Sequence, residues 1–84
     1  MEKHKKKITK HYSYIIHKDV DHYVDNRPTE RAPKVEYTDT KETARKFFDE
    51  DFEVLQIDWN KHDRINVEST NIAIKREERV SVDD

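Results

Sequence analysis

The segment KITKHYSYIIH (residues 7–17) alternates large apolar and polar residues along most of its length. One face of the alternation carries Ile8, Tyr12, Tyr14 and Ile16. A period of two, built from aromatic and β-branched residues, is typical of a strand with one buried face. The first predicted element is therefore a β-strand over about residues 7–17.

Four further strands are predicted from similar patterns. KVEYTD (34–39) alternates over a short length, and FEVLQIDW (52–59) is apolar on both faces, which is typical of a central strand. RINVESTNIAIK (64–75) alternates with a change of phase at residues 69–71, and this change predicts a bulge or a turn. REERVSVDD (76–84) is predicted to close the sheet as an edge strand, because its charges discourage further pairing.

One segment favours a helix. In DTKETARKFFDED (39–51), Ala44, Phe47 and Phe48 have the i, i+3, i+4 spacing of one buried helical face. Acidic and hydroxyl residues at its start can cap the N-terminus. The pattern predicts a short helix over about residues 40–50.

The remaining stretch connects the first strand to these elements. Residues 20–24 fit either half a helical turn or a short second strand, and the two prolines of NRPTERAP (26–33) indicate a loop. Together the segments predict a small single α+β domain. Its expected architecture is a mostly antiparallel sheet of four to five strands, with one short helix packed on one face.

Composition limits the chemistry that the chain can perform. It has 84 residues, which suits one domain, and 43% of them are charged although the net charge is only −2. The absence of cysteine excludes disulfides and thiolate chemistry, and the absence of glycine excludes glycine-rich phosphate loops. No apolar run is long enough for a membrane span, and no apolar signal region follows the basic start. We therefore expect a cytoplasmic protein that does not associate with membranes.

The segment HKDVDH contains a group of metal-ligand residue types. His17, Asp19, Asp21 and His22 could hold zinc or manganese if they converged, because imidazole and carboxylate groups suit these ions. Their spacing matches no standard metal motif, and the residues that follow belong to a loop. An exposed polar connection explains the same letters, so no metal site is predicted.

A second polar group lies in DWNKHD. Asp58, His62 and Asp63, together with His22, could supply a general base oriented by a carboxylate. No matched nucleophile and no oxyanion-hole signature accompany them, and a turn accounts for these residues equally well. We therefore predict no catalytic residues, no cofactor and no enzymatic activity.

Charge is distributed unevenly along the chain. Residues 1–18 are basic, whereas the rest of the chain is acidic. Residues 1–6 are expected to form a flexible basic tail. Lysines beside tyrosines could bind single-stranded nucleic acid, with ammonium groups on the phosphates and rings stacked on the bases. The residues of this hypothesis are Lys3, Lys5, Lys6, Lys7 and Lys10.

Acidic and aromatic residues gather in FFDEDFEVLQIDW (47–59). An acidic patch flanked by rings suits a basic groove on another protein, because aromatic residues often anchor interfaces and opposite charges steer association. Trp59, at the end of a predicted strand, is the ring that we most expect at the surface. The predicted protein-binding residues are Asp49, Glu50, Asp51, Glu53 and Trp59.

In composition the chain resembles the small accessory proteins of bacteriophages and other mobile elements of AT-rich bacteria, which are short and rich in Lys, Glu, Asp, Asn and Ile. The resemblance implies a non-catalytic protein that binds and modulates another protein. Our leading hypothesis is an inhibitor or regulator of a nucleic-acid-handling enzyme or a defence protein, which could act as a homodimer. The alternatives are a small nucleic-acid-binding protein and a metal-dependent nuclease.

Overall fold

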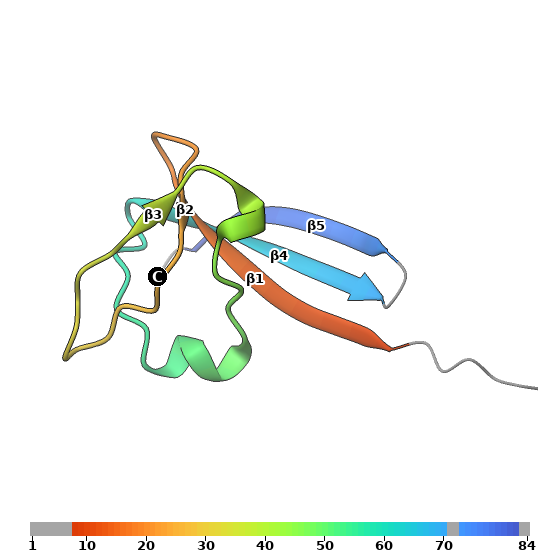
Figure 1. The fold of residues 1–84 in the computed structure, drawn as a ribbon, viewed down its shortest axis with the longest axis horizontal. Helices are drawn as coiled ribbons and strands as arrows, with labels where there is room; N and C mark the ends of the chain where they lie inside the picture. The colour runs from red at the N-terminus through yellow and green to blue at the C-terminus, as the bar shows by residue number, and fades with distance from the viewer. Residues whose placement is uncertain (1–7, 71–72, 83–84) are drawn as a thin grey trace, which may run out of the picture.

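The computed structural model of the protein describes residues 8–70 and 73–82. This part of the chain forms one small domain with a five-stranded antiparallel sheet in the order β3-β2-β1-β4-β5 (Figure 1). The prediction of a mostly antiparallel sheet in a single small domain is confirmed. The strands are β1 (Thr9–His17), β2 (Tyr23–Val24), β3 (Tyr37–Thr38), β4 (His62–Thr70) and β5 (Ile74–Ser81).

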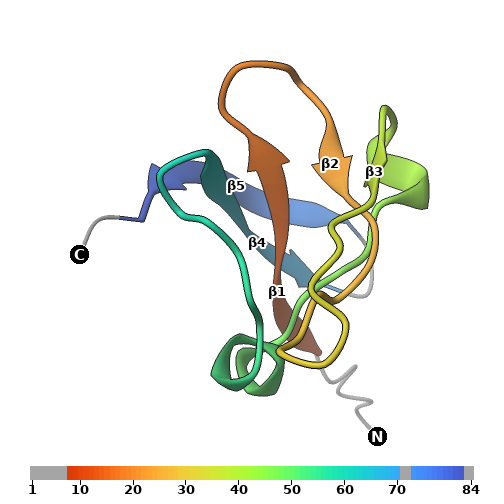
Figure 2. The ribbon, with the colours of Figure 1, turned by 90° about the vertical axis from the view of Figure 1, so that its left-hand side faces the viewer.

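Strand β1 is the centre of the sheet. It pairs with β4 along its whole length, from Thr9↔Thr70 to His17↔His62. On its other edge it pairs with β2 at Ile16 and forms an isolated bridge between Ser13 and Phe47. Both edges of β1 therefore have backbone partners, and the strands twist markedly between β1 and β5 (Figure 2).

The two faces of β1 each support a core, because consecutive side chains of a strand point to opposite faces. Ile15, which interrupts the polar face in the sequence, is fully buried. One core consists of Tyr14, Ile16, Ile65 and Val67. The other consists of Ile15, Val24 and Phe47, with Val35, Phe52, Leu55, Ile57 and Trp59 packed around it.

Strands β4 and β5 occupy the region of the last two predicted strands, but β4 ends at Thr70, and Ile74, which was predicted to lie in the strand over residues 64–75, begins β5. The register between them shifts between Glu68 and Ser69, where the sequence changes phase. Asn71, the last residue of that predicted irregularity, lies outside the described residues. β5 is the last strand in the sheet order, so the predicted edge strand is also confirmed.

The predicted helix over residues 40–50 is wrong. Its place is taken by two short 3-10 segments, η1 (Lys41–Thr43) and η2 (Asp49–Glu53), with an extended stretch between them. In that stretch the N–H and C=O groups of Phe47 bond to Ser13 in both directions at 2.8 Å. These bonds to β1 replace the hydrogen bonds that an α-helix would have made within the segment. The described ranges contain no helix that could cross a membrane.

The predicted central strand over residues 52–59 is also wrong. Residues 54–58 run irregularly and place partly buried side chains over the core around Ile15. Both edges of β1 are already occupied, so this segment covers a face of the sheet instead of joining it. The apolar residues at both alternating positions of this segment are therefore explained by a segment that packs over a face of the sheet, not by a central strand.

Candidate protein-binding surface

An apolar and acidic surface surrounds η2. Phe48 is 41% exposed and Val54 is 48% exposed, although both are large hydrophobic residues. Three exposed carboxylates lie between them in the chain. We call this set the acidic-aromatic surface, and it consists of Phe48, Asp49, Glu50, Glu53 and Val54.

Backbone pairing positions this surface. Phe47 is bridged to Ser13 and its side chain is 0% exposed. Because residues of an extended segment alternate in direction, the next side chain, Phe48, points to the other face. Its ring lies with its centroid 6.3 Å from that of Tyr12 in β1.

Asp51 holds the turn that follows. Its Oδ2 accepts the backbone N–H of Phe48 at 2.8 Å, and its Oδ1 accepts a hydrogen bond from Arg27 Nη1 at 3.1 Å. Asp51 as a whole is only 6% exposed. The N–H of Phe48, followed by the Arg27 guanidinium, holds the pKa of Asp51 below its ordinary value despite this burial.

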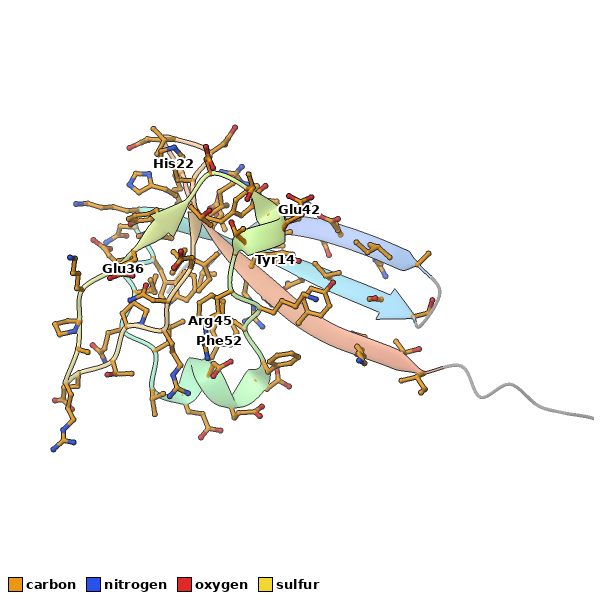
Figure 3. All side chains as sticks on the ribbon, in the orientation of Figure 1. Tyr14, His22, Glu36, Glu42, Arg45 and Phe52 are labelled. Carbon is orange, nitrogen blue, oxygen red and sulfur yellow. The ribbon has the colours of Figure 1, made fainter. Side chains whose placement is uncertain are left out.

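The predicted binding residues therefore separate into two groups. Asp49, Glu50 and Glu53 lie together on the exposed side of η2, whereas Asp51 is buried beneath it. Trp59 is partly buried, and its ring stacks on Phe52 with centroids 6.2 Å apart. Figure 3 shows Phe52 between η2 and the sheet. Trp59 therefore packs against the core and keeps part of its surface exposed.

Phe48 is an exposed ring that sequence reasoning missed. The helical spacing assigned it to the same buried face as Phe47, and only the bridge to Ser13 separates the two rings. An adjacent pair of phenylalanines beside an acidic run is compatible with a helix that buries both rings and with an extended chain that places them on opposite faces. The extended alternative would have predicted one buried and one exposed ring.

The lysines of the nucleic-acid hypothesis are mostly outside the described residues. Lys3, Lys5, Lys6 and Lys7 fall there, and Lys10 is exposed at the start of β1. Tyr14 is buried, and the ring of Tyr12 carries the Nζ of Lys46 at 4.7 Å from its centroid. Both tyrosine rings therefore make contacts within the domain, and the nucleic-acid hypothesis stays a prediction.

The residues of the metal hypothesis do not converge. His17 Nδ1 accepts the backbone N–H of Asp19 at 3.1 Å, and Asp21 lies 3.9 Å from the guanidinium of Arg79. Asp19, Asp21 and His22 are exposed. Within residues 8–70 and 73–82, no group of three or more His, Asp or Glu side chains is placed to hold a metal ion.

His62 is buried, and its contacts differ from those of the general base that was considered and not predicted. Its Nδ1 lies 2.9 Å from the backbone carbonyl of Asp58, so it donates a proton there, and its Nε2 accepts the hydroxyl of Tyr37 at 2.8 Å. Asp63 instead bonds to Arg79 at 2.8 Å. No carboxylate among the described residues orients the imidazole, and both ring nitrogens serve structural hydrogen bonds.

A family model described as "Hypothetical protein of unknown function (DUF2483)" matches residues 1–82. The chain belongs to this family. The match includes all five strands of the DUF2483 sheet and the whole acidic-aromatic surface. Comparisons with curated proteins and with solved structures found no match.

His62 should make the stability of this DUF2483 chain depend on pH. Burial lowers the pKa of His62, with the Asp58 carbonyl opposing and nearby His17 adding to the shift. Because the pKa of His62 is lower in the folded state than in the unfolded state, its contribution to stability is present above the unfolded pKa of about 6.5. This contribution is lost as the pH falls through the pKa of the folded state. We expect the urea midpoint to fall from pH 7 to pH 5, and to fall less in His62→Leu.

His22→Gln is the matched control, because His22 is an exposed histidine near the same end of the sheet. It should show the same loss of stability on acidification as the wild type. Equal pH dependence in the wild type and His62→Leu would contradict the role assigned to His62.

Proposed function

We propose that the protein is a non-catalytic protein-binding module that contacts a basic partner through the acidic-aromatic surface. The observation that supports this proposal is an exposed Phe48 and Val54 among three exposed carboxylates. Large apolar side chains left at the surface and surrounded by charge are typical of interaction sites. The proposed outcome of binding is modulation of the partner's activity.

The surface combines two contributions to association. Covering Phe48 would remove apolar area from water, at roughly 25 cal/mol per Å². The carboxylates of Asp49, Glu50 and Glu53 would attract positive charge and increase the rate of encounter. A protein that handles nucleic acid carries a basic groove for phosphates, so such an enzyme, or a defence protein of the same kind, is the partner class that we propose.

Substitution of this surface should remove binding while leaving the fold intact. We expect Phe48→Ala, and separately the double variant Glu50→Lys with Glu53→Lys, to weaken capture of the partner by about tenfold or more, as for interface anchors and their charges. Glu36→Lys is the control, because Glu36 is an exposed carboxylate near β3. Tagged proteins would be used to capture partners from bacterial lysate, and affinities would then be measured with the captured protein.

The comparison among variants decides the outcome. A protein that is captured by the wild type and by Glu36→Lys, but not by the surface variants, supports the proposal. Capture by all variants alike, or by none including the wild type, counts against it.

A further inference from the structure

A polar cavity lies on the face of the sheet that carries Ile15, next to the acidic-aromatic surface. Its volume is about 270 Å³, and Arg64 and Asn66 of β4, Ser13 and His11 of β1, Phe47 and Asp49 line it. We propose that this cavity binds a carboxylate group, with Arg64 and Asn66 as the hydrogen-bond donors.

Arg64 is held in place from two sides. Its Nε donates to Ser13 Oγ at 3.0 Å, and its Cζ lies 3.9 Å from the centroid of the Phe52 ring. The guanidinium is partly buried, and burial lowers the pKa of Arg64 although Asp49 opposes the shift. Rigid support of this kind fixes the direction of the remaining N–H groups.

No carboxylate in the described part of the chain forms an ion pair with Arg64. Partly buried charges in proteins are normally paired, because removal from water is costly without a partner. Arg64 therefore lines the cavity without an ion-pair partner, although the carboxylate of Asp49 lines the same cavity and interacts with it at longer range. An acceptor from outside the chain would complete the site.

Asn66 supplies a second donor. Ser13 Oγ lies 2.8 Å from Asn66 Oδ1 and donates to it, which leaves the amide Nδ2 directed away from Ser13. Ser13 and Asn66 are direct cross-strand partners, and Arg64 is two residues along the same strand on the same face. The hydroxyl of Ser13 thus orients both donors that line the cavity.

A carboxylate fits this site better than a phosphate. One guanidinium edge can bind the two oxygens of a carboxylate in a planar, bidentate arrangement. Asp49 lines the same cavity, so a doubly charged phosphate would be repelled more strongly than a singly charged group. The small volume also favours a single planar group over a large ligand.

The test uses two sources of carboxylate. Propionate represents a free organic acid, and acetyl-trialanine represents the C-terminus of a peptide, with the amidated peptide as its control. Each would be titrated into ¹⁵N-labelled protein while the side-chain N–H signals of Arg64 and Asn66 are followed. We expect saturable shifts with both acids and none with the amide. Tighter binding of the peptide than of propionate assigns the site to peptides, and the reverse assigns it to small acids.

Two variants make the test specific. Arg64→Lys keeps the charge but loses the planar donor edge, so binding should weaken by about tenfold. Asp49→Asn removes the repelling charge, so binding should strengthen by about twofold or more. Phe48→Ala should bind the probes like the wild type, which separates this site from the proposed protein-binding function.

Three results would overturn the proposal. The first is the absence of a shift with either acid, both in the wild type and in Asp49→Asn. The variant is included because its neutral amide cannot form an ion pair with Arg64. The second is unchanged binding in a folded Arg64→Lys variant. The third is tighter binding of inorganic phosphate than of propionate.

Discussion

Phe47→Ala is expected to lose about 3–5 kcal/mol of the free energy of unfolding, whereas Phe48→Ala should stay close to the wild type. Removal of a fully buried phenylalanine side chain typically has an effect of this size, because it removes apolar contact and leaves a cavity. A domain of this length buries a smaller fraction of its surface than a larger domain does and has little stability in reserve. The Phe47 variant should therefore be largely unfolded at room temperature.

The position of Phe47 explains why the loss is large. Its side chain is 0% exposed in the core of Ile15 and Val24, and its ring lies 6.1 Å from that of Phe52. Phe52 belongs to η2, so a cavity at Phe47 also removes the packing beneath that segment. The neighbouring Phe48 is the control, because the same substitution there removes a ring that is 41% exposed.

Urea denaturation followed by circular dichroism measures both variants. A Phe47→Ala protein with a midpoint close to that of the wild type would show that the second core contributes little. Equal losses in the two variants would show that Phe48 is not a surface residue.

The strands were predictable where the sequence pattern reports burial of one face. The alternation at Tyr12, Tyr14 and Ile16 and the change of phase near Ser69 both have direct counterparts in the sheet. The segment around Phe47 was not predictable, because its apolar spacing fits a helix as well as an extended chain. Whether this segment forms a helix or an extended chain depends on Ser13, which is distant in sequence and whose backbone groups pair with those of Phe47.

The candidate sites show the same limit. The exposed carboxylates of Asp49, Glu50 and Glu53 follow from composition alone, since charged side chains are seldom buried. The burial of Asp51 does not, because it depends on Arg27, which is 24 positions away. The cavity that we propose to bind a carboxylate likewise depends on a hydrogen bond between Ser13 and Asn66, 53 positions apart.

Asp51→Ala is expected to lose about 2 kcal/mol of the free energy of unfolding, whereas Glu50→Ala should change it by less than about 0.5 kcal/mol. The buried carboxylate of Asp51 accepts the N–H of Phe48 and pairs with Arg27. Hydrogen bonds to charged groups contribute about 1.5–3 kcal/mol, while the Arg27 pair adds little because its guanidinium is exposed. Glu50 is exposed on the same 3-10 turn.

The pH dependence of this loss identifies its cause. The lowered pKa of Asp51 means that its contribution is present above the unfolded pKa of about 3.9 and is lost as pH falls through the folded value. The difference in urea midpoint between the wild type and Asp51→Ala should therefore be full near neutral pH and shrink below about pH 4. Capture of the partner by Asp51→Ala should follow its folded fraction, unlike capture by Phe48→Ala. A folded Asp51→Ala variant with wild-type stability and no partner binding would instead place this carboxylate in the interface.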